Sequence, residues 1–200
     1  DFRALDLAGT QNDSAEAIYN PEKYLLYCDP FMGQFDNRVK PADAAGYANC
    51  AARLAVYADH AEYGYLFRSL RALCAFLSVK ADLGIRTRAA YLSSDKKAAK
   101  ALCTDYDAAL ERLDAFYAAY EQQWMHENKP QGFDVVDLRI GGQRQRLLHC
   151  RDRLLAYAEG RLDRIEELEE PVLDCCCEEK ADGQATRAIF WHEIASANVI

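Results

Sequence analysis

A short segment beyond the middle of the chain concentrates side chains that could bind a sugar or meet another protein surface. Residues 122–142 combine a large aromatic ring, amide groups and both signs of charge around an expected turn. Flat rings beside planar hydrogen-bonding groups are typical of carbohydrate sites and interface cores. The candidate residues for an interface or a pocket rim are Trp124, Glu127, Asn128, Lys129 and Arg139. The pattern favours packing within the domain over such a role, because Trp124 continues an apolar helical stripe and Asn128 suits a helix end.

Motifs for catalysis or metal binding are missing from the sequence. None of the four histidines is three or four residues from another, so no helix presents a histidine pair to one ion. His126 and Glu127 match the start of a zinc-protease motif, but Pro130 replaces its second histidine. No nucleophile elbow, Walker loop or dinucleotide-binding glycine motif occurs. We therefore expect no metal, no cofactor and no catalytic residue.

The eight cysteines are read as core fillers and free thiols. Five lie singly among apolar or helix-forming residues, where a thiol acts as a small hydrophobe: Cys28, Cys50, Cys74, Cys103 and Cys150. The adjacent residues 175–177 are all cysteine but lack the spacer that lets two thiolates face one ion, so zinc is only the lesser alternative there. Unpaired thiols favour a reducing compartment, and we expect a cytoplasmic location.

Charge and hydropathy exclude two classes of partner. The formal net charge is −8, which would repel a nucleic-acid backbone. No apolar run reaches the ~18 residues of a membrane span, and no secretory signal is present.

The arginines of residues 144–153 are expected on an exposed helix face with i,i+4 acidic partners. Because the chain starts at Asp1 rather than at Met, we expect it to be a piece of a longer protein.

Helical patterns fill the chain from Pro41 onward. Pro41 suits the first position of a helix, and an alanine-rich run follows it to about residue 60. A leucine-rich amphipathic run over residues 62–91 predicts a second helix with a kink near Gly84.

The second half of the chain predicts two further helices. The third is expected to be capped by Ser93 or Ser94 and to end before Pro130, and its apolar stripe is the clearest in the sequence. After an extended stretch over residues 133–140 and two glycines, the fourth is expected over residues 143–167.

These patterns predict an all-α fold, an antiparallel bundle of about four long helices over residues 41–171. Residues 1–40, interrupted by several prolines, are expected to be an irregular connector that packs on an upstream domain. Residues 172–200 are expected to be a mixed tail with a docked strand or turn. The expected core residues are Leu70, Leu77, Leu102, Leu113, Phe116, Leu147, Leu154 and Leu162.

Four segments, in order, resemble one known family. They are NPEKYLLYCDPFMG (20–33), LGIRTRAAY (83–91), WMHENKPQGF (124–133) and DLRIGG (137–142). Together they are similar to the C-terminal helical region of a bacterial branch of glycoside hydrolase family 20, over about residues 20–170. Cys28 stands where this resemblance leads us to expect asparagine.

The resemblance implies a role beside an enzyme rather than an active site. Family members cleave terminal β-linked N-acetylhexosamines by a substrate-assisted route in an upstream barrel, where an adjacent Asp-Glu pair does the chemistry. This chain contains no Asp-Glu dipeptide and no barrel-sized strand-helix alternation. We expect a non-catalytic accessory domain of an exo-β-N-acetylhexosaminidase, with the barrel as partner, terminal N-acetylhexosaminide glycans as the parent's substrate, and a homodimer left open. The alternative is a free-standing helical module that binds a protein through residues 124–142.

Overall fold

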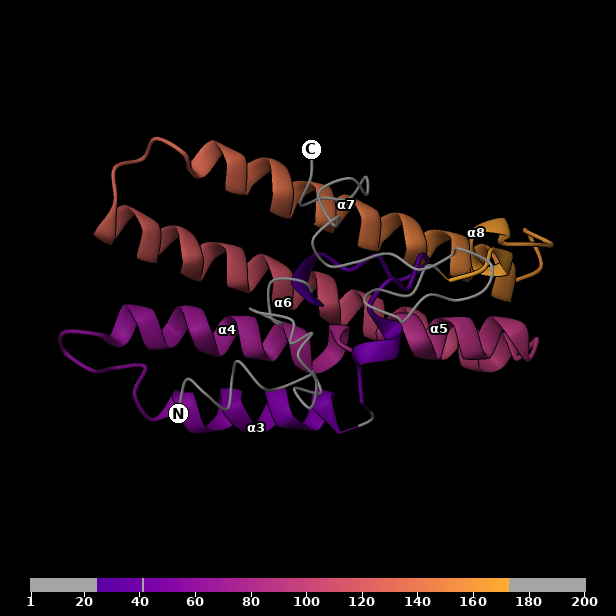
Figure 1. Cartoon of the computed structure of the whole chain (residues 1–200), viewed down its shortest axis with the longest axis horizontal. Coiled ribbons are helices and arrows are strands. Elements are labelled where there is room, and N and C mark those ends of the chain that lie inside the picture. The colour runs from indigo at the N-terminus through magenta and orange to yellow at the C-terminus, as the bar shows by residue number, and fades with distance from the viewer. Residues whose placement is uncertain (1–24, 41, 173–200) are drawn as a thin grey trace, which may run out of the picture.

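The computed structural model describes residues 25–40 and 42–172 (Figure 1). These residues contain a short 3-10 helix, η1 (Asp36–Arg38), and six α-helices. The α-helices are α3 (Asp43–Ala55), α4 (Gly64–Lys80), α5 (Leu83–Leu92), α6 (Lys96–Glu127), α7 (Phe133–Ala158) and α8 (Glu166–Glu169). No strand occurs in this part of the chain, so the expected all-α class is confirmed. The tail beyond residue 172, with its expected strand or turn and its three cysteines, lies outside the described residues.

The four long helices lie side by side in chain order, and each runs antiparallel to the one before it (Figure 1). The main packing contacts join α3 to α4, α4 to α6 and α6 to α7, so α3 and α7 form opposite edges of one layer. Short connections favour this order, because antiparallel neighbours bury their apolar faces with little loop between them. The helix α5 packs on α6 and continues the layer beyond the end of α4.

Residues 25–40, called here the N-terminal segment, are part of the core of this layer. Six of their apolar side chains are buried: Leu25, Leu26, Tyr27, Cys28, Phe31 and Phe35. The buried Lys80 of α4 donates from Nζ to the carbonyl oxygens of Leu25 (3.1 Å) and Cys28 (2.5 Å). The expected connector therefore packs on this bundle itself over residues 25–40, because the bundle offers partners to its apolar side chains. Contact of residues 1–24 with an upstream domain stays a prediction.

The expected single helix over residues 62–91 is two helices, because the chain turns at Ala81 and Asp82. Gly84, expected at a kink, lies in the first turn of α5 against the N-terminal segment. A Cβ atom added to Gly84 would lie 2.8 Å from the carbonyl oxygen of Pro30. This glycine therefore permits two backbones to approach closely rather than bending a helix.

The helix α6 begins one or two residues later than expected. Its N-cap is Asp95, whose side chain accepts a hydrogen bond from the N–H of Ala98 (2.9 Å), so the expectation of Ser93 or Ser94 was wrong. Ser93 instead donates to the carbonyl oxygen of Ala89 at the end of α5 (2.8 Å). Ser94 has a φ of 55°, the left-handed conformation that turns the chain between the two helices.

The helix α7 starts earlier and ends earlier than expected. Residues 133–140 are helical rather than extended, and the helix runs through the glycines at 141 and 142 to Ala158 instead of to about residue 167. A glycine inside a helix costs about 1 kcal/mol relative to alanine. Burial of Phe133 against aromatic rings of α6 and of Ile140 in the core offsets this cost.

The expected core is largely confirmed. Six of the eight expected residues are buried: Leu77, Leu102, Leu113, Phe116, Leu147 and Leu154. Leu162 is half-buried and packs at the edge of the core, and Leu70 is half-buried at the wall of a pocket. The two exceptions lie where the apolar stripes reach the surface of the layer.

The arginines of α7 join different elements instead of forming i,i+4 pairs on one exposed face. Arg144 and Arg151 bind carboxylates of α6 at 2.7 and 2.5 Å. Arg146 is three-quarters buried and binds Asp29 of the N-terminal segment through Nε (2.5 Å) and Nη2 (3.2 Å). Arg151 also binds Asp152, its neighbour in the chain (2.7 Å), which agrees with the expectation of a nearby acidic partner. The other partners lie far from their arginines in the sequence, where a search near each arginine could not find them.

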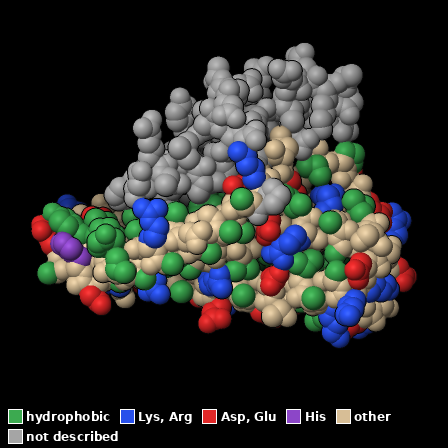
Figure 2. Space-filling model, turned by 90° about the horizontal axis from the view of Figure 1, so that it is seen from below, with side chains coloured by type: hydrophobic (Ala, Val, Ile, Leu, Met, Phe, Trp, Pro, Cys, Tyr) green, Lys and Arg blue, Asp and Glu red, His purple; other side chains and the backbone are tan. Residues whose placement is uncertain are grey.

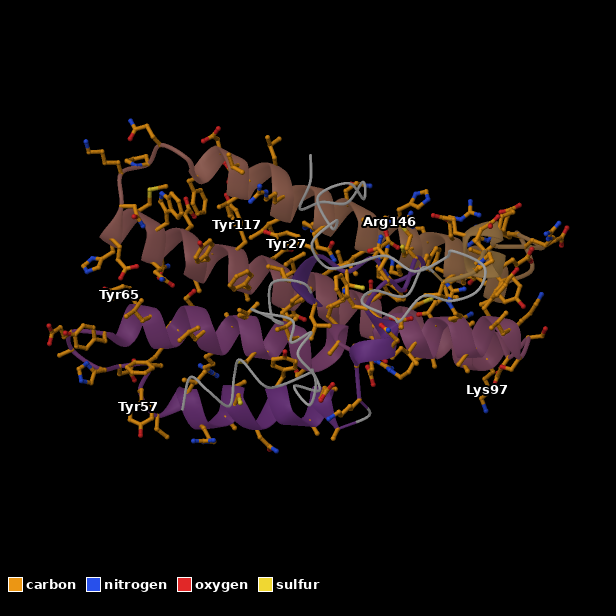
Figure 3. All side chains as sticks on the ribbon, viewed as in Figure 1. Tyr27, Tyr57, Tyr65, Lys97, Tyr117 and Arg146 are labelled. Atoms are coloured by element: carbon orange, nitrogen blue, oxygen red, sulfur yellow. The ribbon has the colours of Figure 1, made fainter. Side chains whose placement is uncertain are left out.

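Asp29, Arg146 and Glu167 form a clamp that holds the N-terminal segment to α7 and α8. Arg146 extends from α7 in Figure 3. The Asp29 carboxylate also accepts the N–H groups of Phe31 (2.8 Å) and Met32 (3.1 Å). Burial alone would raise the pKa of Asp29, but the hydrogen bonds and charge of Arg146, with these N–H groups, outweigh burial and lower that pKa. Arg146 also reaches Glu167 at 2.6 Å, so one side chain fastens three elements.

Glu169 fastens α8 to α5 and makes this contact sensitive to acid. Its carboxylate accepts hydrogen bonds from Arg164 and from the hydroxyl of Tyr91 (2.5 Å), and these lower its pKa from 4.5 to about 2. Because the pKa is lower in the folded state, the stabilisation is complete above pH ~4.5 and is lost as the pH falls toward ~2.

We therefore expect Glu169→Gln to flatten the pH dependence of the melting temperature between pH 5 and pH 2.5, as followed by circular dichroism. Glu170→Gln is the matched control, because its side chain is exposed and no hydrogen bond or ion pair to its carboxylate is seen among the described residues. Equal pH profiles for Glu169→Gln and the wild type would contradict this role of Glu169.

Candidate functional site

Trp124 shapes the turn between α6 and α7. Its Nε1–H donates to the carbonyl oxygen of Lys129 (2.9 Å), and its ring centroid lies 5.7 Å from that of Phe133. Gly132 has a φ of 96° and lies beneath the indole, so that an added Cβ would be 3.5 Å from the ring. Trp124 therefore holds this turn in one conformation, as the packing alternative expects, and fixes where the residues around it point.

Glu127 lies at the centre of a hydrogen-bonded group that joins α6 to α4. Its carboxylate accepts from the hydroxyl of Tyr65 (3.1 Å) and from the amide of Gln123 (3.2 Å). The ring of Tyr65 lies 4.3 Å from that of His126, and Tyr65 extends from α4 at the same end of the layer (Figure 3). Partial desolvation and the hydrogen bond to Glu127 both raise the pKa of Tyr65, so this phenol stays protonated and donates.

Asn128 and Lys129 are exposed in the turn itself. Asn128 ends α6 in an extended conformation, and its N–H donates to the carbonyl oxygen of Trp124 (2.8 Å). No acidic partner of the Lys129 ammonium is seen in the described part of the chain. The turn therefore presents an amide and a positive charge to the surroundings on a rigid base.

Arg139 lies further along α7 and is not part of the turn. It lines a pocket of about 340 Å³ between α4, α6, α7 and the N-terminal segment. The Nε atom of Arg139 is buried and has no hydrogen-bond partner among the described residues. Gln123 links the two places, since it lines the pocket and also binds Glu127. The structure thus gathers four of the five candidate residues at the turn and places the fifth in a pocket.

Large exposed apolar side chains gather at the same end of the layer, which we call the apolar end (residues 56–63 and 124–138). Six of the eight such side chains in the described residues belong to it: Val56, Tyr57, Tyr63, Met125, Val135 and Leu138. Figure 2 shows hydrophobic side chains gathered beside a histidine at the left end of the molecule. Sequence reasoning missed Val135 and Leu138, because residues 133–140 were taken as extended. A helical reading of that stretch would have placed Val135 and Leu138 on one outward face.

The described residues contain no group of three His, Cys, Asp or Glu side chains that could hold a metal ion. Their buried thiols are hard to ionise: burial is the largest cause that raises the pKa of Cys28, to about 11, and that of Cys150. No helix in this part of the chain is long and apolar enough to cross a membrane.

Comparison with protein families gives one match and one negative result. The model of the Glycoside Hydrolase 20C C-terminal domain matches residues 1–187. The chain belongs to this family. No curated protein matches the sequence of this chain.

The match confirms the resemblance seen in the four sequence segments and extends it in both directions. The N-terminal segment lies inside the matched range, in agreement with its burial in the core. The apolar end and the Arg139 pocket also lie inside the matched range.

Proposed function

We propose that this chain is the non-catalytic C-terminal accessory domain of an exo-β-N-acetylhexosaminidase, and that its apolar end packs against the catalytic domain of the same polypeptide. Membership of a family of glycoside hydrolase C-terminal domains supports a linked catalytic domain. In this proposal the parent enzyme removes terminal β-linked N-acetylglucosamine or N-acetylgalactosamine, with the sugar's own acetamido oxygen attacking the anomeric carbon in an upstream barrel.

The concentration of exposed apolar side chains at one end carries the proposal. Scattered apolar residues on a surface are ordinary, but a gathered set marks an interaction site. Polar groups border this set at the turn between α6 and α7, where Asn128 and Lys129 are exposed a few residues after Met125. An apolar centre with a polar rim is the usual composition of a protein interface.

Trp124, Glu127 and Arg139 take different parts in this interface. Trp124 and Glu127 hold the turn and its link to α4 in place, as their hydrogen bonds support. Arg139 supplies a positive charge at the pocket beside the turn. We also place the enzyme in the cytoplasm, which the free thiols of all five described cysteines support.

The test is reconstitution of the enzyme from two pieces. The catalytic domain of the parent enzyme and this chain are produced separately, and their binding is measured by titration calorimetry. We expect binding, no hydrolysis of a chromogenic N-acetylglucosaminide by this chain alone, and at least ~10-fold weaker binding by Leu138→Asp, which puts an unpaired charge into the interface.

Leu92→Asp is the matched control, since Leu92 (64% exposed) and Leu138 (63% exposed) are equally accessible. Leu92 is the last residue of α5, and α5 lies at the opposite end of the layer from the turn between α6 and α7 (Figure 1). It is expected to bind like the wild type. Absence of binding by the wild-type chain, or an equal loss with both variants, would overturn docking through the apolar end.

A further inference from the structure

Arg139 is an exception among the arginines of the described residues. Six others are half-buried like Arg139, and every one of them has a hydrogen-bonding partner. Arg86, Arg146, Arg151 and Arg153 bind carboxylates, whereas Arg88 and Arg112 bind backbone carbonyl oxygens. Arg139 differs from them because no hydrogen bond or ion pair of its guanidinium is seen in this part of the chain, and its buried Nε is also without a partner. A guanidinium withdrawn from water without a partner is costly, so its position calls for an anion that the described residues do not supply.

The pocket beside Arg139 has the walls of a small-molecule site. Leu70, Leu73, Phe116, Val136 and Ile140 give it apolar surface from three helices. Tyr27, Tyr120 and Gln123 add polar groups, and no described Asp or Glu lines it. Burial raises the pKa of Tyr27 while the charge of Arg139 opposes that rise, so the guanidinium lies near this phenol. The volume of about 340 Å³ is at the lower end of the range of known ligand sites, roughly 300–1,000 Å³.

We propose that this pocket is a binding site for a monocarboxylate attached to an apolar body. A carboxylate matches the planar fork of a guanidinium and accepts two parallel hydrogen bonds from it. The apolar walls receive the rest of the molecule. Phosphate and sulfate fit poorly, because they are strongly hydrated, carry more charge and bring no apolar surface to the walls.

Two sources could provide this carboxylate. One is a free small molecule, and the other is an acidic side chain of the linked catalytic domain, which rests on the proposed function. Binding of a small probe to this chain alone tests the site without any catalytic domain, so the site and the docking proposal can fail separately.

The experiment uses phenylacetate and its neutral amide, phenylacetamide, as probes of the 200-residue chain. Titration followed by amide chemical shifts is expected to give saturable binding of phenylacetate, with a dissociation constant on the order of 1 mM and shifts in α6 and α7. Phenylacetamide has the same shape without the charge, and we expect at least ~10-fold weaker binding. Arg139→Gln is expected to weaken phenylacetate binding by at least ~10-fold as well.

Two further variants distinguish the need for the charge of Arg139 from the need for an empty pocket. Arg144→Gln removes a guanidinium of the same helix outside the pocket and is expected to leave binding unchanged. Val136→Phe keeps Arg139 but fills the pocket and is expected to abolish binding. If Arg139→Gln does not fold, as judged by far-ultraviolet circular dichroism, the amide probe and Val136→Phe still decide the matter.

The proposal is overturned if the wild-type chain shows no saturable binding of phenylacetate, or if phenylacetamide or Val136→Phe gives equal binding. Where phenylacetate does bind, the parent enzyme distinguishes the sources. Binding to the isolated chain but not to the parent enzyme assigns the pocket to an acidic side chain of the catalytic domain. Binding to both assigns it to a free carboxylate.

Discussion

Arg146→Ala is expected to lower the free energy of unfolding by about 3–5 kcal/mol, because it leaves the carboxylate of Asp29 buried without its partner. The side chain of Asp29 is 12% exposed, and its carboxylate accepts hydrogen bonds from both Nε and Nη2 of Arg146. The same change removes the guanidinium from its place 5.5 Å from the ring centre of Phe31 and releases Glu167. Equilibrium denaturation in urea, followed by circular dichroism, measures the effect.

Arg144→Ala is the control for this variant. Arg144 lies on the same helix and also pairs with an aspartate, Asp114, but both side chains are about half exposed. An exposed pair contributes about 0–1 kcal/mol, so Arg144→Ala is expected to change stability little. Similar losses in the free energy of unfolding for the two variants would show that burial does not strengthen the contribution of the Asp29 contact.

Leu113→Ala is expected to cost about 2–5 kcal/mol, since Leu113 is completely buried on α6 and the change leaves a cavity. The helix α6 packs against α4, α5 and α7, so neighbours on several sides prevent an easy collapse into the space. Thermal and urea unfolding measure the loss. Leu92→Ala, at a largely exposed leucine, is the comparison, and a Leu113 variant no less stable than it would show that the core is not centred on α6.

The sequence predicted those parts of the fold that depend on local pattern. The stripe of α6 repeats every three or four residues, and this periodicity was sufficient to predict the helix and its buried face. The start of α7 could not be predicted in this way. Residues 133–142 contain β-branched residues and two glycines, and they are helical because Phe133 and Ile140 find buried places against other helices.

Long-range contacts explain the remaining differences in fold and site. The N-terminal segment was expected to lie outside the bundle, because no local signal shows that Lys80 binds its carbonyl groups. The turn around Trp124 was recognised because its residues are adjacent in sequence. The pocket was not, because it is assembled from three helices and the N-terminal segment. Among its lining residues only Arg139 was a candidate site residue, whereas Leu70 and Phe116 were expected in the core.

The bond between Arg146 and Asp29 is also expected to influence how the layer unfolds. In a single layer each helix contacts mainly its neighbours, and such arrays can open from an edge one helix at a time. The contact joins residues 117 positions apart and closes a loop that contains α3, α4, α5 and α6. Closing a loop this long costs conformational entropy only once, and the closed loop then restrains all the helices within it. The clamp therefore couples the helices into one cooperative unit, and its loss would let the edges exchange their amide hydrogens independently of the centre.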